Sequence, residues 1–368
     1  MEYSTYFLAR ALNTLPDTFA AVACSDMPDV PSNFPYPYKV YMAKSFSVLT
    51  KFLYRRNIER MIKREKINIL HGMMFHGGGA TAVEIGRKLG IPVITQSHGS
   101  DVQEVPEIGY GAPFYPEGLA RTKYAIKNSD SVVALSSLIK TRIVELGGAA
   151  DKIVVIPNGF PEEEISAITK ENLRPKYKIS DGDFVIVSSG RNRPVKRVDL
   201  LFQALSLLKK DRNKIKHVCV GPIENLPEMV RSFDVENMVI LTGRIHYKKE
   251  KDVRFPPYPE LINLYRSANL YVSTSYVEAF NTSELEALAC GTPVLVTKNQ
   301  GIRDVIIEGE TGFTLKKDDP ETLAETLLEL MKMKEELAKR RDYIKNSVSH
   351  LNWTDIARRM REVYLSVL

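Results

Sequence analysis

The sequence predicts an α/β protein built from two doubly wound domains. The 368 residues exceed what one hydrophobic core usually organises, and the chain is 44% hydrophobic and 26% charged, as folded globular proteins are. Short apolar segments also alternate with longer amphipathic ones through both halves. This alternation is typical of parallel sheets that helices cover on both faces.

The predicted strands and helices follow one rhythm in both halves. Strands of the first half are expected at Phe19–Cys24, Ile67–Leu70, Pro92–Thr95, Ser131–Ala134 and Ile153–Ile156. Strands of the second half are expected at Phe184–Ser188, Lys216–Val220, Met238–Leu241, Leu270–Ser273 and Pro293–Val296. Helices between them include Ala80–Leu89, Ser137–Leu146, Val198–Lys209, Pro259–Ser267 and Thr282–Ala289. Each half is therefore expected to be an open doubly wound domain.

The boundary between the halves is predicted near Asn158-Gly159, a turn signal that follows a strand. The polar stretch Pro161–Asp183 then reads as a linker. A charged helix follows Asp319, and a last helix begins near Thr354. In open α/β sheets, ligands bind beyond the carboxyl ends of the strands. Two such domains that face each other would form a cleft, with the chemistry in the loops that follow strands.

Composition excludes several classes of protein. No apolar run approaches the roughly 20 residues needed to span a bilayer, and the polar start is unlike a secretory signal. Cys24, Cys219 and Cys290 lie far apart and form no metal-ligand pair, so we expect buried thiols in a reducing, cytoplasmic compartment. A net charge of +6 is compatible with nucleic acid, a sugar nucleotide or an anionic membrane surface as partner.

Two glutamates flank a predicted helix start in the second half. Glu278 lies in the loop before the helix, and Glu286 lies about one turn inside it. Backbone N–H groups at a helix start favour a phosphate, and carboxylates beside it can accept hydrogen bonds from sugar hydroxyls. The structural alternative is a capped amphipathic helix with solvated acids, in which Asn281, Thr282 or Ser283 is the cap.

A basic loop follows the first predicted strand of the second half. Gly190 allows a tight turn there, and Arg191 and Lys196 lie among several cations between Ser188 and Asp199. Cations at a strand end suit a pyrophosphate and would neutralise charge on a nucleoside-diphosphate leaving group. The structural alternative is an ordinary solvated basic loop.

A group of polar residues follows a predicted strand of the first half. His98 is predicted to be an active-site residue, and Asp101 either orients it or caps the next turn. His71 and His76 are interpreted as structural. The run Gly77-Gly78-Gly79 has no acidic ribose-binding partner about 20 residues later, so no dinucleotide site is predicted.

The segment from Glu278 to Gly291 resembles the signature of retaining glycosyltransferases of family 4, which have the two-domain GT-B fold. It reads Glu, seven residues, Glu, then Ala-Leu-Ala-Cys-Gly-Thr-Pro-Val. The resemblance implies that Glu278 holds hydroxyls of the transferred sugar and that Glu286 binds the ribose. It also implies that backbone N–H groups of Phe280, Asn281 and Thr282 meet the sugar and the distal phosphate.

The same resemblance assigns roles outside this segment. Arg191 and Lys196, which follow Gly190 in an element similar to the family's Gly-Arg…Lys, would be the diphosphate cations. His98, in a His-Gly-x-Asp element completed by Asp101, would reach the donor sugar and phosphate. The backbone at Arg244 and Ile245 would meet the nucleotide base.

The chain departs from the family pattern in three places. Asn281 stands where the family often has Gly, which we attribute to the tolerance of Asn for unusual backbone angles. Arg197 stands where a Gly usually follows the lysine. Glu2–Leu12 resembles the family's first helix, but the strand and Gly-rich turn that should precede it are absent.

The resemblance also fixes the expected domains. The last helix, 353–368, is similar to the family helix that crosses back to the first domain. An acceptor-side domain is therefore predicted at 1–160 plus 353–368, with its first strand missing. A donor-binding domain is predicted at 161–352.

These likenesses imply a retaining glycosyltransferase. It would move a hexose-type sugar from a UDP- or GDP-sugar to a glycan, lipid-linked or small-molecule acceptor, in cell-surface polysaccharide or glycolipid synthesis. We expect front-face transfer, in which the departing diphosphate takes the acceptor proton. No metal cofactor is expected, because Arg191, Lys196 and the helix start would stabilise the developing charge.

The stretch Lys39–Lys66 carries nine basic residues against two acidic ones, with aromatic residues between them. The pattern is typical of a basic amphipathic helix, which could bind the anionic inner face of the cell membrane. The structural alternative is a helix face exposed to solvent. Nucleic acid is disfavoured as a partner, because the cations cluster at strand ends beside carboxylates.

Two other functions remain open from the sequence. One is a GT-B sugar-nucleotide epimerase, although that family lacks the segment from Glu278 to Gly291. The other is a non-catalytic, truncated protein that binds a nucleotide-sugar.

Overall fold

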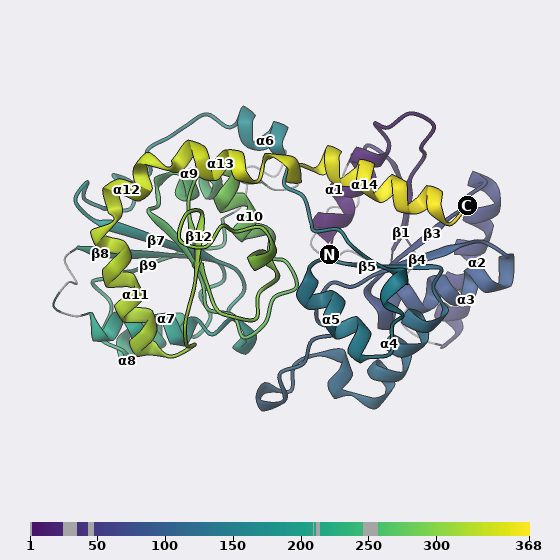
Figure 1. Ribbon diagram of the computed structural model, residues 1–368, viewed down its shortest axis with the longest axis horizontal. Helices are drawn as coiled ribbons and strands as arrows, with labels where there is room; N and C mark the ends of the chain where they lie inside the picture. Colours follow the sequence, from purple (N-terminus) through teal and green to yellow (C-terminus); the bar gives the residue numbers. More distant parts are fainter. Residues whose placement is uncertain (1, 25–34, 43–47, 209, 211–213, 246–256) are drawn as a thin grey trace. The chain divides into compact units, whose positions relative to one another are not determined.

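The computed structural model describes residues 2–24, 35–42, 48–208, 210, 214–245 and 257–368 (Figure 1). The chain divides into two compact units. The first unit comprises the described parts of 1–159 and 353–368, and the second unit comprises those of 160–352. Every sheet in both units pairs its strands in parallel, and helices cover the sheets. The predicted class, two doubly wound α/β domains, is confirmed.

The first unit is built on a four-stranded parallel sheet. Its order is β3 (Leu70–Met73), β4 (Val93–Gln96), β5 (Ser131–Ala134) and β6 (Ile153–Val155). The helices of this unit are α1 (Glu2–Leu12), α2 (Val48–Glu65), α3 (Ala80–Leu89), α4 (Pro116–Asn128), α5 (Ser137–Glu145) and α14 (Trp353–Ser366). Apolar side chains of β4 and β5, such as Ile94 and Val133, are fully buried, as expected for central parallel strands.

A separate two-stranded parallel sheet precedes this one in the chain. It joins β1 (Ala21–Cys24) to β2 (Lys39–Met42), and β1 does not enter the four-stranded sheet. Strand β2 was not predicted from the sequence, because its four residues are too few to show a pattern and both of its terminal residues are exposed. The prediction of one basic helix from Lys39 is therefore wrong at its start, since α2 begins at Val48.

The strand predicted at Ile67–Leu70 begins three residues later. Helix α2 ends at Glu65, Lys66 adopts a left-handed conformation with φ 53°, and Ile67 N–H donates to Ile62 O at 3.0 Å. Ile67 then packs beside Met61 and Ile62 in a small apolar cluster. Ile67 is apolar because it packs at the C-terminal end of α2, and it is not part of the strand.

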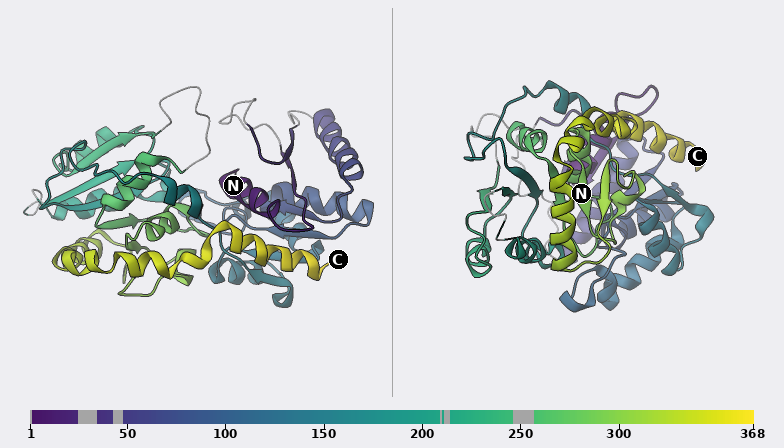
Figure 2. Two further views of the ribbon diagram at one scale, coloured as in Figure 1. Left: turned by 90° about the horizontal axis from the view of Figure 1, so that it is seen from above. Right: turned by 60° about the vertical axis from the view of Figure 1, so that its left-hand side comes forward.

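The C-terminal helix α14 packs beside α1 in the first unit, as Figures 1 and 2 show. The rings of Phe7 and Trp353 stack with centroids 6.2 Å apart. Arg359 Nη2 also donates to Val155 O at 2.9 Å, and the Tyr364 hydroxyl lies 2.8 Å from His71 Nδ1. These contacts connect α14 to both a strand and a helix of this unit.

The second unit is built on a six-stranded parallel sheet in the order β12-β11-β10-β7-β8-β9. The strands are β7 (Phe184–Ser189), β8 (Ile215–Val220), β9 (Val239–Gly243), β10 (Leu270–Ser273), β11 (Val294–Val296) and β12 (Gly312–Thr314). The chain runs outward from β7 to β9 and then returns to place β10 on the other side of β7. The carboxyl ends of β7 and β10 are therefore a topological switch point, where such sheets bind ligands.

Helices cover both faces of this sheet (Figure 1). One buried apolar cluster joins the sheet to four helices. The sheet contributes side chains such as Phe184 and Val272. The helices are α7 (Val198–Leu207), α8 (Leu226–Ser232), α11 (Pro320–Lys332) and α12 (Lys334–Lys339). The helices α9 (Pro259–Ser267) and α13 (Arg341–Ser347) each pack against α10 (Thr282–Ala289), and none of the three contributes a residue to that cluster.

The stretch Pro161–Asp183, read from sequence as a linker, is part of the second unit. It contains α6 (Glu162–Ala167). Arg266 fixes it from α9 by donating to Ile165 O at 2.7 Å and to Ile168 O at 2.9 Å. Across the described part of the chain, no helix is both long and apolar enough to cross a bilayer.

Candidate donor-binding site

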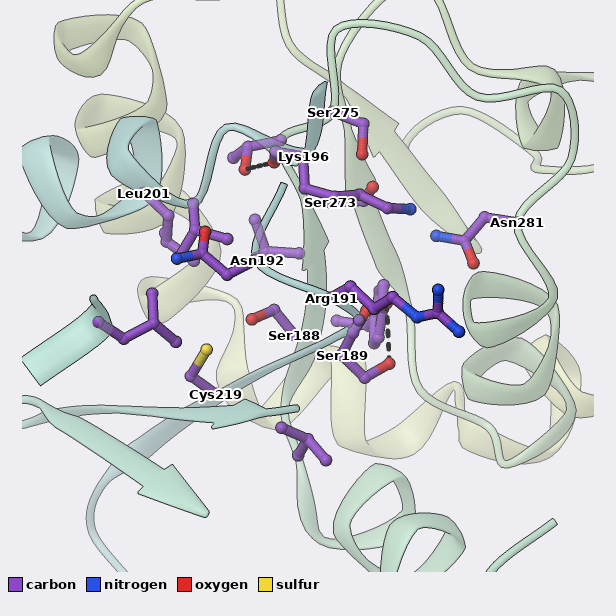
Figure 3. Close-up of a pocket in the computed structure, with 17 residues that line it drawn as sticks. Ser188, Ser189, Arg191, Asn192, Lys196, Leu201, Cys219, Ser273, Ser275 and Asn281 are labelled. Carbon is purple, nitrogen blue, oxygen red and sulfur yellow. Dashed lines mark hydrogen bonds between the residues drawn. The ribbon is translucent and has the colours of Figure 1, made fainter. Parts of the chain in front are cut away.

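A pocket lies at the switch point of the second unit (Figure 3). Its walls come from the loop after β7 and the loop after β10, with the floor supplied by the strand ends. Lining residues include Ser188, Gly190, Arg191, Asn192, Lys196 and Asn281. The pocket therefore gathers residues of the basic loop and of the α10 start, two segments that the sequence analysis singled out separately.

Three glycines lie at the ends of neighbouring strands, and one of them, Gly190, lines the pocket. Gly190 N–H donates to Val220 O at 3.0 Å, and Gly221 N–H donates to Gly243 O at 3.1 Å, so the ends of β7, β8 and β9 are hydrogen-bonded in series. Gly221 has φ 146°, and a Cβ there would lie 2.0 Å from Gly190 O. Only glycine permits this approach of two backbone segments.

The loop after β7 is fastened to the loop after β10. The Thr274 hydroxyl lies 3.0 Å from Lys196 O and 2.7 Å from Arg197 O, and Tyr276 N–H donates to Val195 O at 2.8 Å. Lys196 is therefore held by backbone contacts on both sides of its own position. Arg191 is exposed, and its side chain extends in the direction of Asn281 (Figure 3).

Lys196 and Glu278 form an ion pair at this pocket. The Ser275 hydroxyl donates a second hydrogen bond to the same carboxylate oxygen, Glu278 Oε1, at 3.0 Å. Burial alone would lower the pKa of Lys196, but the charge and hydrogen bond of Glu278 outweigh it and raise that pKa above its usual value. The lysine is thus a fixed cation at neutral pH.

Arg197, where the family usually has Gly, adopts a left-handed conformation with φ 47° and ψ 47°. A residue with a side chain is strained there, which explains the preference of the family for glycine. Two contacts offset the strain. The guanidinium lies 4.4 Å from the Tyr276 ring centroid, and Arg197 Nη2 donates to Asp318 O at 3.0 Å.

Helix α10 begins with a side-chain cap. Asn281 has φ −81° and ψ 119°, and its Oδ1 accepts from Ser283 N–H at 3.1 Å. The explanation offered from sequence, that Asn281 tolerates an unusual backbone angle, is wrong, because its conformation is an ordinary extended one. Asn281 is there as the N-cap. Thr282 follows as the first residue of the helix.

The other residues assigned to the donor lie around α10 and β9. Phe280 and Glu286 are buried, Phe280 just before α10 and Glu286 within it. The charge of Glu286 contributes to raising the pKa of buried Tyr265, after burial and the neighbouring Tyr271. Arg244 is exposed and Ile245 is half-buried, and both directly follow β9.

Glu284, in the first turn of α10, was given no role from the sequence. Its side chain is fully buried, and its Oε1 accepts from Asn281 Nδ2 at 3.0 Å. Burial and then the charge of Glu278 raise the pKa of Glu284 to about 8. Glu284 lies three residues after the N-cap Asn281, where a Glu often completes a capping box. This spacing could have indicated Glu284 from the sequence.

His98 and Asp101 lie in the first unit, in the loop after β4. Asp101 is fully buried and its Oδ1 accepts from Ser97 Oγ at 2.7 Å and from the backbone N–H groups of His98 and Gly99 at 3.2 and 3.0 Å. Its Oδ2 accepts from Phe75 N–H at 2.9 Å. Asp101 caps the turn that precedes it, because its carboxylate accepts from the backbone N–H groups of His98 and Gly99 and not from the His98 ring. The cap predicted for the following turn is therefore misplaced.

The imidazole of His98 is half-buried, with Nε2 3.3 Å from Met73 Sδ. Burial lowers its pKa to about 3, so the ring is neutral at physiological pH. A neutral imidazole can donate or accept one hydrogen bond at its second nitrogen.

The remaining histidines and glycines of the first unit shape its backbone. His71 pairs with Tyr364, and His76 O accepts from Arg121 Nε at 2.7 Å. The glycine run lies in a π-helical turn, Met74–Gly79, that leads into α3. A Cβ at Gly78 would lie 2.6 Å from Met73 O, so the tight turn itself requires glycine.

A metal ion would need several acidic, histidine or thiol side chains close together. The described residues contain no group of three or more His, Cys, Asp or Glu side chains able to hold an ion. The sequence has one Asp-x-Asp run, Asp181-Gly182-Asp183. It precedes β7, at the end of the strand opposite the pocket, where Asp183 Oδ2 accepts from Ser180 N–H at 2.8 Å. Cys219 lines the pocket, and burial raises its pKa to about 11.

Both units are α/β units with parallel sheets, and one of them has a basic loop and a capped helix start at its switch point. Together these features define a glycosyltransferase of the GT-B class. The chain belongs to glycosyltransferase family 4. The family model described as glycosyl transferases group 1 matches residues 169–349, and the model described as Glycosyltransferase Family 4 matches residues 1–164. The resemblance stated from the motifs is thus confirmed over both units.

Named relatives extend this result. An uncharacterized glycosyltransferase of Methanocaldococcus jannaschii is 26% identical over 306 residues, which is 83% of this chain and 77% of the relative. D-inositol 3-phosphate glycosyltransferase 1 of Catenulispora acidiphila is 24% identical over 307 residues, 82% of this chain and 72% of the relative. The structure of Anabaena HepE in complex with UDP and glucose matches with a TM-score of 0.73 at 18% identity, covering 100% of this chain and 96% of that one.

Proposed function

We propose that this glycosyltransferase moves a hexose-type sugar from a UDP- or GDP-sugar to its acceptor with retention of the anomeric configuration. The ion pair between Lys196 and Glu278 at the switch-point pocket carries the proposal. A lysine suits a diphosphate, and a carboxylate suits sugar hydroxyls. A donor would separate the two, because each then meets the group that its chemistry fits. The HepE complex with UDP and glucose supports UDP-glucose as the first donor to test.

The transfer step is proposed to occur on one face of the sugar. The bond from the anomeric carbon to the diphosphate oxygen breaks, and the acceptor oxygen forms its bond on the same face. The acceptor hydroxyl proton passes to the departing diphosphate oxygen. Arg191, Lys196 and the α10 start at Thr282 stabilise the charge that develops on the diphosphate.

Further contacts to the donor are assigned by family resemblance. Glu286 is proposed to bind the ribose, and the backbone at Phe280 and Asn281 to meet the sugar and distal phosphate. The backbone at Gly190, Arg244 and Ile245 is proposed to bind the diphosphate and the base. His98 is proposed to act on the donor as a neutral imidazole, with Asp101 fixing the backbone that carries it.

Transfer is proposed to need no metal ion, since the two cations and the helix start supply positive charge at the leaving group. Activity should therefore survive treatment with EDTA. Loss of activity with EDTA and its return with Mn²⁺ would contradict this part of the proposal.

The acceptor is proposed to be a glycan, a lipid-linked sugar or a small molecule, in polysaccharide or glycolipid synthesis. The relative named D-inositol 3-phosphate glycosyltransferase supports testing a polyol phosphate first. The basic residues of α2 are proposed to bind an anionic membrane surface at the inner face of the cell membrane. Co-sedimentation with anionic vesicles at low salt tests this, and absence of binding would remove it.

One experiment separates this function from the two alternatives. Nucleoside diphosphates are first screened for a rise in melting temperature, and the matching nucleotide-sugars are then incubated with the protein. A glycosyltransferase releases the nucleoside diphosphate by slow donor hydrolysis. A sugar-nucleotide epimerase would change the sugar, and a non-catalytic binder would leave the donor intact after a positive shift.

A further inference from the structure

Glu284 places a carboxyl group with an unused oxygen beside the proposed donor pocket. Its side chain is fully buried at the third position of α10. Asn281 Nδ2 donates to Oε1 at 3.0 Å, whereas Oε2 is buried and has no hydrogen-bond partner among the described residues. A buried carboxylate oxygen without a partner is costly, which favours the neutral acid.

The two charged neighbours of Glu284 act in opposite directions: the charge of Glu278 raises its pKa and that of Lys196 lowers it, and burial together with Glu278 prevails. Three titratable groups face it from separate elements: Lys196 from the loop after β7, Glu278 from the loop before α10, and Tyr271 from β10. Lys196 is already engaged by Glu278. A second carboxylate charge at Glu284 would face Glu278 with no cation of its own, and two like charges at one buried site raise the pKa of one of them.

A diphosphate in the pocket would change this balance further. It brings negative charge to Lys196 and therefore close to Glu284. An ionised Glu284 would repel it, whereas a protonated one would not. The diphosphate and the proton on Glu284 are two ligands of one protein, and the coupling between them is reciprocal. If the diphosphate binds more tightly when Glu284 is protonated, its binding must raise the pKa of Glu284.

We propose that Glu284 is a positioning residue that must be protonated for a nucleoside diphosphate to bind beside Lys196, so that donor binding and proton uptake at Glu284 are coupled. This inference rests on the proposed function, since it needs a diphosphate in the pocket. It adds a role for a residue that lies between the two signature glutamates of the family.

The competing explanation is a capping box. A Glu three residues after the N-cap often bonds back to the cap, and the hydrogen bond from Asn281 to Glu284 fits that arrangement. Such a role concerns helix stability alone. It gives no reason for the affinity of a diphosphate to change with pH through Glu284.

The test compares the pH dependence of UDP and GDP binding in the wild type and in Glu284→Gln, by calorimetry from pH 6.5 to 9.0. For the tighter ligand, wild-type affinity should fall about tenfold over this range, because the proton is lost as pH rises through the pKa of Glu284, about 8. Glutamine has nearly the shape of a protonated glutamate and stays neutral at every pH. The affinity of Glu284→Gln for the nucleotide should therefore change over this range only as far as ionisation of the uracil or guanine base requires.

A second measurement uses the wild type alone and is independent of whether the variant folds. The binding enthalpy at pH 8.5 is measured in buffers of different ionisation enthalpy. Coupling predicts the uptake of about 0.8 proton per diphosphate bound, because a carboxyl with a pKa of about 8 is about three-quarters ionised at pH 8.5. No proton uptake, or the same pH dependence in wild type and Glu284→Gln, overturns the inference while leaving the donor site intact. No binding of UDP or GDP at any pH overturns the proposed function and this inference together.

Discussion

Lys196 Nζ and Ser275 Oγ both donate to one oxygen of Glu278, the serine at 3.0 Å. The two donors come from different crossover loops of the sheet, one after β7 and one after β10. This shared oxygen links the cation proposed for the diphosphate to the carboxylate proposed for the sugar. A change at Glu278 is therefore expected to affect both ends of the bound donor.

Glu278→Gln should reduce the turnover of a nucleotide-sugar by about 100-fold or more, because it removes a charged acceptor from sugar hydroxyls and the partner of Lys196. Turnover is measured by release of the nucleoside diphosphate. Glu310→Gln is the matched control, since exposed Glu310 accepts from Tyr343 on the surface at 2.6 Å. The control should lose less than about twofold. Similar small losses in both variants would contradict the site.

Arg197 offers a test of backbone strain. Arg197→Gly relieves the left-handed strain but loses the contacts to Tyr276 and Asp318, so its unfolding free energy should stay within about 1 kcal/mol of the wild type. Arg197→Ala keeps the strain and loses the contacts, and should be less stable by about 1–2 kcal/mol. Urea unfolding measures both. An alanine variant as stable as the glycine variant would show that the strain argument is wrong.

Gly221→Ala should displace Gly190, which lines the pocket. Its Cβ would lie 2.0 Å from Gly190 O at φ 146°, so we expect a loss of at least about 2 kcal/mol in unfolding free energy and weaker diphosphate binding. Gly182→Ala is the control, because a Cβ there meets nothing within 4 Å. Equal stability of the two variants would mean that the glycine contact does not constrain the loops.

We expect the protein to lose stability in acid, because the pKa values of two histidines are lowered in the folded state. Burial lowers the pKa of His71 to about 4 and that of His217 to about 3, whereas an unfolded histidine titrates near 6.5. The unfolded chain therefore binds more protons between these values, and the unfolding free energy should fall as pH drops below about 6.5. His217→Gln should reduce this slope, and exposed His350→Gln controls for the loss of a histidine. An unchanged slope in His217→Gln would contradict this account.

Much of the second unit could be read from its pattern. The helices at 259–267 and 282–289 have the predicted bounds, because each combines an apolar period with a proline or a cap at its start. The strand at 270–273 also has its predicted bounds, because it is a short and fully buried run. Strand β12 was missed, since three residues with a leading glycine carry little strand signal. Strand β2 was missed because it is only four residues long and its two end residues are exposed.

The pocket was predictable as a list of residues but not as an arrangement. Motif spacing indicated Arg191, Lys196 and Glu278, and the structure brings them to the same strand ends. The burial of Glu284 and the stacking of Arg197 on Tyr276 depend on packing between segments far apart in sequence. Local periodicity holds no information on such contacts, and the pKa of Glu284 follows from them.

The central claim is that the switch-point pocket binds the diphosphate of a sugar nucleotide through Lys196. Calorimetric titration of UDP and GDP into the wild type, Lys196→Ala and the exposed-site control Lys332→Ala tests it most directly. We predict that one of the two nucleotides binds the wild type and Lys332→Ala alike, and binds Lys196→Ala at least about tenfold more weakly. Equal affinity in all three proteins, or no binding of either nucleotide to the wild type, would contradict the account.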